Sequence, residues 1–168
     1  MPWTIPNLLT LLRVALIPVI GALYLLDFPG YIVAIVFLLA GLTDWLDGYL
    51  ARHLNEASPF GAFLDPVADK LMVSVVLVLL AADVTLVGSV ISPALFTVVT
   101  AIIIGREITI SALREWMAEL GRRGVVAVGW IGKVKTILQF VAITVLLFAQ
   151  AGVQNGVVVL GEMLLYAA

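Results

Sequence analysis

Charge, histidine and cysteine are scarce in this sequence of 168 residues. The absence of cysteine excludes disulfides and thiolate metal sites, and the single histidine, His53, leaves a zinc site without its usual ligands. Charged residues make up 12% of the chain, against about 25% in an ordinary soluble domain. Hydrophobic residues make up 63%. No basic tail is present, so nothing indicates a nucleic-acid partner, and the composition places the chain in a lipid bilayer.

Apolar runs lie between charge clusters and turn signals throughout the chain. A helix needs about 20 mainly apolar residues to cross the hydrocarbon core. The runs predict helices over residues 7–26, 31–52, 61–82, 92–118, 126–150 and 155–168. The last run is too short to cross alone, so either the chain ends inside its final helix, which we favour, or this run lies at the interface.

The predicted fold is therefore all-α, an integral membrane bundle of six transmembrane helices. No internal repeat or linker divides it, so we expect one domain over residues 1–168. The opening residues MPWTIPNLL, with Trp3 and two prolines, predict a short N-terminal segment at the membrane interface before the first crossing.

The positions of lysine and arginine predict the orientation of the bundle. The connections near 27–31, 83–91 and 150–155 contain neither residue, whereas Arg52 and the pair Arg122–Arg123 lie in the connections on the other side. Positively charged loops stay in the cytoplasm. We therefore expect the N-terminus and the 52–61 connection to face the cytoplasm.

Four aspartates flank that connection. Asp44 and Asp47 are three residues apart near the end of one predicted helix, and Asp65 and Asp69 are four apart near the start of the next, so each pair shares a helix face. A carboxylate costs roughly 2.5–3.5 kcal/mol at the centre of a membrane helix. Because a short connection makes the two helices antiparallel neighbours, the pairs can converge into one site.

Four converging carboxylates need positive charge nearby. Structural ion pairs with Arg52 and Lys70 are one alternative, but two cations cannot neutralise four anions. Hard divalent cations with oxygen ligands are the natural countercharge, and Mg²⁺ or Mn²⁺ suits a set of carboxylates. The acids therefore predict a divalent-metal site near the cytoplasmic face.

The residues around these acids match a known pattern, D-x2-D-G-x2-A-R-x8-G-x3-D-x3-D. Its specified positions are Asp44, Asp47, Gly48, Ala51, Arg52, Gly61, Asp65 and Asp69. The chain thereby resembles the CDP-alcohol phosphotransferases, integral membrane enzymes of phospholipid synthesis. Further stretches, among them FGAFLDPVADK, REITISALREWMAELG and WIGKVKT, resemble the bacterial phosphatidylglycerophosphate synthases of that family.

The resemblance implies a reaction and its participants. The phosphatidyl group of CDP-diacylglycerol would pass to sn-glycerol 3-phosphate, giving phosphatidylglycerophosphate and CMP, at the cytoplasmic face of a bacterial inner membrane. It implies two divalent cations, with Asp44 and Asp65 bridging both, Asp47 completing the first and Asp69 touching the second. Asp69 would also be the general base. Membrane lipids and a second copy of the chain, in a homodimer, are the other implied partners.

The resemblance also implies a nucleotide site. Its residues would be Asn7, Thr10, Gly48, Arg52 and Ser58. Without the resemblance, an equally good interpretation is that Asn7 caps the N-terminus of a helix and that the hydroxyl of Thr10 bonds to a backbone carbonyl of its own helix.

A phosphorylated acceptor needs a cationic pocket. Arg106 and Arg114, eight residues apart on one predicted helix, and Lys133 and Lys135 on the next are the candidates. Alternatively, Arg114 pairs with nearby glutamates and the two lysines serve only orientation.

Two other functions remain open on the sequence. Within the family the acceptor could be serine, inositol phosphate or phosphatidylglycerol, because the aspartates are common to all. Outside enzymes, a divalent-cation transporter could use carboxylates in the membrane, although it would be expected to place them at the midplane on broken helices. A non-catalytic scaffold gives no reason for so costly a site.

Overall fold

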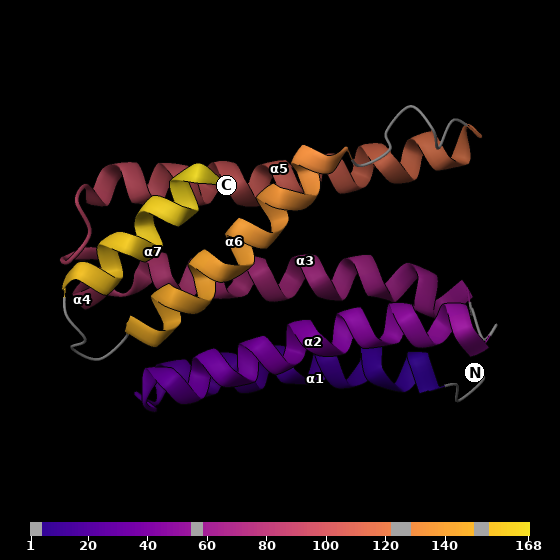
Figure 1. Ribbon diagram of the computed structural model, residues 1–168, viewed down its shortest axis with the longest axis horizontal. Coiled ribbons are helices and arrows are strands. Elements are labelled where there is room, and N and C mark those ends of the chain that lie inside the picture. Colours follow the sequence, from indigo (N-terminus) through magenta and orange to yellow (C-terminus); the bar gives the residue numbers. More distant parts are fainter. Residues whose placement is uncertain (1–4, 55–58, 122–128, 150–154) are drawn as a thin grey trace. The chain divides into compact units, whose positions relative to one another are not determined.

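The computed structural model describes residues 5–54, 59–121, 129–149 and 155–168, with only the backbone described at 5–7, 44–54, 59–60, 62–63, 65 and 155. Within these ranges every regular element is a helix (Figure 1). The helices are α1 (Ile5–Leu25), α2 (Gly30–Leu54), α3 (Pro59–Ala82), α4 (Val84–Val87), α5 (Pro93–Glu119), α6 (Trp130–Ala149) and α7 (Asn155–Ala167). The chain forms two compact units, Met1–Leu79 and Leu80–Ala168.

The first unit begins with two helices joined by a tight turn. Asp27 has a φ of 54°, in the left-handed region that a short polar side chain tolerates. The N–H of Phe28 donates to the carbonyl of Leu23 at 3.0 Å, and that of Asp27 to the carbonyl of Tyr24 at 3.2 Å. These two bonds satisfy carbonyls that the end of α1 leaves open, and Pro29 then keeps the helix from continuing.

Packing between α1 and α2 supplies much of the first unit's core. The buried positions recur every three or four residues along each helix, as expected for one face of a helix. The buried apolar residues of the unit include Ile20, Tyr24, Val33, Phe37, Ala40, Ala68, Met72 and Val76. Thr10 and Arg13 of α1 are buried as well. Both lie in the first half of this helix, which is the half predicted to be nearer the cytoplasm, so the interior is polar there.

The second unit begins with a short helix that the sequence did not predict. The carboxylate of Asp83 accepts hydrogen bonds from the N–H groups of Thr85 and Leu86, which makes Asp83 the N-cap of α4. Ser92 then caps α5, accepting from the N–H of Leu95, and Pro93 occupies the first turn, where its missing N–H costs nothing. A polar residue therefore starts each of these two helices.

Helices α6 and α7 pack closely in the second unit. A Cβ atom built on Gly161 would lie 2.7 Å from Cγ of Leu146 and 3.3 Å from the backbone nitrogen of the same residue. Such distances leave room for hydrogen alone, so α7 approaches the backbone of α6 at this point. Glu162, fully buried on α7, accepts a hydrogen bond from the N–H of Ile91 at 2.9 Å and another from the hydroxyl of Tyr166 at 2.5 Å.

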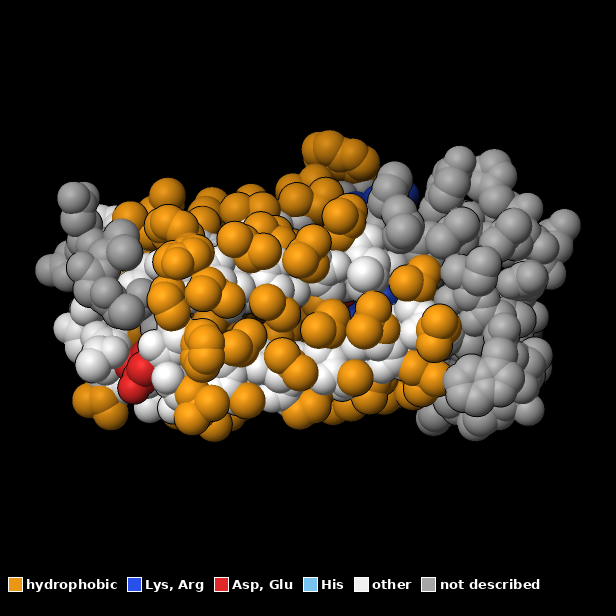
Figure 2. Space-filling view, turned by 90° about the horizontal axis from the view of Figure 1, so that it is seen from below, with side chains coloured by type: hydrophobic (Ala, Val, Ile, Leu, Met, Phe, Trp, Pro, Cys, Tyr) orange, Lys and Arg blue, Asp and Glu red, His pale blue; other side chains and the backbone are white. Residues whose placement is uncertain are grey.

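Among the residues described with their side chains, three helices are long and apolar enough to cross a membrane. They are Leu8–Leu25 within α1, all of α5 and all of α6, and shorter apolar stretches cover Gly30–Thr43 and Gly156–Ala167. Large hydrophobic side chains are exposed along the described helices, and Figure 2 shows them covering much of the face that it draws. An apolar exterior is what lipid contact requires, so the prediction of a helical membrane protein is confirmed.

The helix bounds agree with the predicted runs to within a few residues. Part of the predicted interfacial segment, residues 1–4, lies outside the described residues, and from Ile5 onward the backbone is helical and continuous with α1. Pro6 falls in the first turn of that helix, a position that proline tolerates.

Candidate active site

The pattern D-x2-D-G-x2-A-R-x8-G-x3-D-x3-D forms the signature of this chain, and its four aspartates lie on consecutive helices of the first unit. On α2, Asp44 lies ten residues and Asp47 seven residues before the last residue of the helix. On α3, Asp65 lies six residues and Asp69 ten residues after the first residue of the helix. At about 1.5 Å per residue, one aspartate of each helix lies about 15 Å from the 55–58 connection and the other about 10 Å. Because both helices run back from that connection (Figure 1), the two pairs lie at matching heights.

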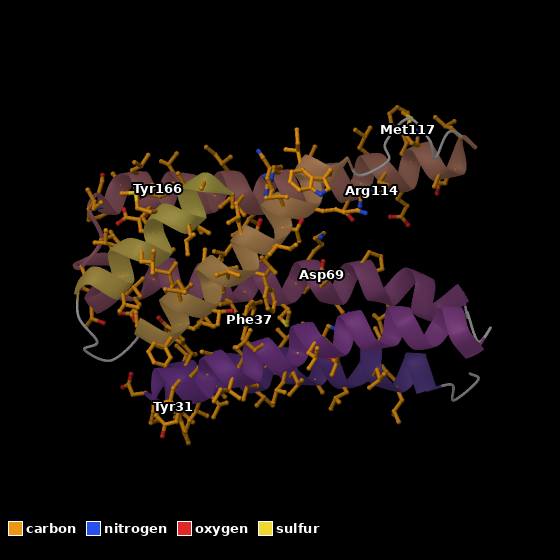
Figure 3. All side chains as sticks on the ribbon, viewed as in Figure 1. Tyr31, Phe37, Asp69, Arg114, Met117 and Tyr166 are labelled. Carbon is orange, nitrogen blue, oxygen red and sulfur yellow. The ribbon has the colours of Figure 1, made fainter. Side chains whose placement is uncertain are left out.

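Asp69 is described with its side chain, which Figure 3 labels on α3. The side chain is 34% exposed, and its Oδ2 lies 2.8 Å from Nζ of Lys70. An ion pair this exposed contributes about 0–1 kcal/mol. Lys70 therefore neutralises one carboxylate, as the ion-pair alternative expected. The side chain of Arg52, the second cation of that alternative, lies outside the described residues.

The donor chemistry of the signature fits a divalent cation. In the part of the chain described with side chains, no three His, Cys, Asp or Glu residues gather as a metal site. The side chains of Asp44, Asp47 and Asp65 are outside that part. What the structure does provide is four residues with carboxylate oxygens at two matched heights on two helices. An oxygen-only set suits Mg²⁺ or Mn²⁺.

The residues predicted to bind the nucleotide are spread over α1, α2 and the connection after it. Thr10 is buried on α1, one turn beyond Asn7. Asn7 lies within the first turn of α1, which begins at Ile5, so it is not the N-cap that the alternative interpretation required. The side chains of Asn7, Gly48 and Arg52 lie outside the described residues, as does the whole of Ser58.

The cations predicted for the acceptor all lie in the second unit. Arg106 is half-buried on α5, and Arg114 is exposed two turns further along the same helix. Lys133 and Lys135 are exposed in the first two turns of α6. Three of the four thus remain open to solvent or ligand, whereas Arg106 is bonded to other parts of the unit.

Arg114 also tests an alternative interpretation, in which it pairs with a neighbouring glutamate. Glu115 and Glu119 are exposed on the same helix, and among the described residues neither forms an ion pair with Arg114. The guanidinium of Arg114 is therefore available for an anionic ligand.

A comparison with known proteins decides the family. A family model described as CDP-alcohol phosphatidyltransferase matches residues 3–167. This chain belongs to that family. All eight positions of the signature lie inside the matched range, so the resemblance read from them is confirmed.

Individual members of the family are close in sequence. A relative from Pectobacterium atrosepticum is 48% identical over 170 residues, covering 100% of this chain and 88% of the relative. Relatives from Salmonella choleraesuis and Escherichia coli strain K12 are each 49% identical over 150 residues, covering 88% of this chain and 79% of each relative. All three bear the name CDP-diacylglycerol–glycerol-3-phosphate 3-phosphatidyltransferase.

The sequence interpretation missed three buried polar residues among those described in the second unit: Thr100, Gln139 and Glu162. Gln139 of α6 and Glu162 of α7 are 4% and 0% exposed. Gln139 and Glu162 each interrupt an apolar run of their helix, which is the signal that would have singled them out, because an unpaired polar group is costly in such a place. Tyr166, four residues after Glu162, is a partner that helical spacing could have named. The bonds of Gln139 to Arg106 and of Glu162 to Ile91 could not have been named from spacing, since they join distant parts of the chain.

Proposed function

We propose that this chain transfers the phosphatidyl group of CDP-diacylglycerol to sn-glycerol 3-phosphate, giving phosphatidylglycerophosphate and CMP. The observation that carries the proposal is the complete aspartate signature on α2 and α3 of a chain that belongs to the CDP-alcohol phosphatidyltransferase family. Bacterial relatives 48–49% identical to it are named for this reaction. The chain is an enzyme of phospholipid synthesis.

The signature aspartates would hold two divalent cations, Mg²⁺ or Mn²⁺. Asp44 and Asp65 would bridge both, Asp47 would complete the first and Asp69 would contact the second. Bound there, the cations would neutralise the pyrophosphate of CDP-diacylglycerol and polarise the phosphorus under attack. Asp69 has a second role as general base, its carboxylate taking the proton of the attacking glycerol hydroxyl. The half-exposed position of that side chain supports this role, because a base must reach its substrate.

Two sets of side chains would position the substrates. Asn7, Thr10, Gly48, Arg52 and Ser58 would bind the cytidine nucleotide. Arg106, Arg114, Lys133 and Lys135 would bind the phosphate of the acceptor, with the arginines suited to paired contacts and the lysines to single ones. The exposure of Arg114, Lys133 and Lys135 supports this assignment.

The placement in the membrane belongs to the same proposal. The chain forms one domain of six crossings in a bacterial inner membrane, with its N-terminus and active site on the cytoplasmic side. Helices at all six predicted ranges and a single family model over residues 3–167 support this arrangement. The exposed hydrophobic side chains would contact membrane lipids, and a second copy of the chain would complete a homodimer.

A divalent-cation transporter is the rival from another class. Such a protein is expected to carry its acids at the membrane midplane, on helices that are interrupted there. Here α2 is continuous from Gly30 to Leu54, and its aspartates lie in its second half, toward the 55–58 connection. The location of the acids therefore favours the enzyme.

Incorporation of radiolabelled sn-glycerol 3-phosphate into chloroform-soluble lipid tests the proposal. Purified protein in detergent, with CDP-diacylglycerol and Mg²⁺, should produce labelled phosphatidylglycerophosphate, and EDTA should abolish the incorporation. Asp44→Asn, which keeps the size of the side chain but removes its charge, should abolish it too. Full incorporation by Asp44→Asn would contradict the metal-site proposal, and no incorporation by the unaltered protein would contradict the reaction.

A further inference from the structure

The guanidinium of Arg106 is tied into the second unit by three hydrogen bonds. Its Nη2 donates to Oε1 of Gln139 on α6 at 3.0 Å and to Oε1 of Glu107 at 3.3 Å. Its Nη1 donates to the backbone carbonyl of Ala168 at 3.0 Å. Helix α5 is thus linked through one side chain to α6 and to the end of α7. A long, flexible arginine is thereby held in a single orientation.

Two donors of Arg106 remain for a ligand. A guanidinium has five N–H groups, and the three bonds above use three of them. One of the remaining two, on Nε, is buried and has no hydrogen-bond partner among the described residues. A buried donor without a partner is costly. The side chain as a whole is 26% exposed, so a ligand reaches it at atoms other than Nε, and the second N–H of Nη1 is the donor left there.

Gln139 is the unusual member of this cluster. It is 4% exposed within an apolar run of α6 and has no role in the reaction as proposed above. Its amide is neutral, so it fixes the guanidinium of Arg106 without adding to the negative charge that the ion pair with Glu107 already places beside it. A carboxylate at the same place would hold Arg106 equally well but would oppose the acceptor's phosphate.

We infer that Gln139 is a positioning residue that orients Arg106 toward the phosphate of the acceptor. This inference rests on the proposed function, which assigns Arg106 to that phosphate. Gln139 itself does not touch the substrate. Its bond to Nη2 holds one side of the guanidinium against α6 and leaves the second N–H of Nη1 for the phosphate oxygen.

Kinetics of a Gln139→Met variant test the inference, since methionine keeps the length of the side chain but removes the amide acceptor. The KM for sn-glycerol 3-phosphate should rise about five- to tenfold, the equivalent of one ordinary hydrogen bond. The KM for CDP-diacylglycerol should stay within about twofold, because the nucleotide residues lie elsewhere in the chain. Thr144→Val is the matched control: Thr144 lies on the same helix and bonds only to the carbonyl of Phe140 among the described residues, so both KM values should be unchanged.

A double-mutant cycle separates positioning from packing. In an Arg106→Gln background, Gln139→Met should change the KM for the acceptor by less than about twofold, because the residue it acts through is gone. If Gln139→Met does not fold, Gln139→Asn replaces it, since the shorter amide draws its oxygen away from Arg106 and should raise the same KM.

Each contrary result identifies what has failed. A Gln139→Met effect that persists in the Arg106→Gln background, or that changes both KM values and the melting temperature alike, would overturn the inference and make Gln139 a packing residue. An unchanged KM in Arg106→Gln alone would overturn the assignment of Arg106 and the inference with it. No turnover of sn-glycerol 3-phosphate by the unaltered protein would overturn the proposed function itself.

Discussion

Removal of the Glu162 carboxyl group tests how α7 is anchored in the second unit. Glu162 is fully buried, and its two oxygens accept from the N–H of Ile91 and from the hydroxyl of Tyr166. Glu162→Leu removes both bonds and leaves the backbone N–H of Ile91 without this partner. Glu162→Gln keeps the shape of the side chain and one acceptor oxygen.

The size of the effect follows from these two bonds. A side-chain hydrogen bond in a membrane protein contributes about 0.6 kcal/mol on average and about 1.7 kcal/mol at most. A buried donor left unpaired costs about 1–3 kcal/mol. Leucine offsets part of this loss because it ends the burial of a carboxyl group. We therefore expect Glu162→Leu to lower the free energy of unfolding by about 2–3 kcal/mol and Glu162→Gln by about 1 kcal/mol.

Thermal unfolding in detergent measures the loss. For a chain of this length about 1 kcal/mol corresponds to about 2–4 °C, so Glu162→Leu should melt about 4–12 °C below the unaltered protein. Glu119→Gln makes the same chemical change as Glu162→Gln, but at an exposed position at the end of α5, and it should leave the melting temperature unchanged. A Glu162→Leu variant as stable as the unaltered protein, or a Glu119→Gln variant that loses as much, would refute the reasoning.

Two further predictions concern the α6–α7 contact and the proposed base. Gly161→Ala should destabilise the protein by about 1–3 kcal/mol in the same melting assay, because its Cβ would meet Leu146 at 2.7 Å, whereas Gly156→Ala has nothing within 4 Å and should be neutral or slightly stabilising. Equal melting temperatures for the two variants would contradict the close approach. Asp69→Asn should lower kcat by about 100-fold or more, while Lys70→Met should lower the free energy of unfolding by less than about 1 kcal/mol. A kcat for Asp69→Asn within tenfold of normal would remove Asp69 as the base.

The long helices could be predicted from the sequence because apolar runs and turn signals agree. Asp27 to Gly30 ends α1 as the turn signals indicated, and Ser92 with Pro93 begins α5 as predicted. The four-residue helix α4 was missed because it is too short to show a periodic pattern. The one sign of α4 in the sequence is Asp83, an aspartate directly before the helix that can cap its N-terminus.

The candidate site was predictable only as far as its residue types and spacing allow. The aspartate pairs were expected at a helix end and a helix start, and the bounds of α2 and α3 place them there. The bonds of Arg106 could not be foreseen. Gln139 follows it by 33 residues and Ala168 by 62, and no periodicity within one helix relates them. Contacts between helices depend on packing geometry, which the spacing along one helix does not encode.

Release of CMP from CDP-diacylglycerol, measured with one acceptor at a time, tests the central claim most directly. The purified protein would be offered sn-glycerol 3-phosphate, serine, inositol, inositol phosphate or phosphatidylglycerol, each with Mg²⁺ and each with EDTA. The account predicts release with sn-glycerol 3-phosphate and Mg²⁺, and none once EDTA is added. Release with another alcohol but not with sn-glycerol 3-phosphate would contradict the acceptor, and release that survives EDTA would contradict the metal site of Asp44, Asp47, Asp65 and Asp69.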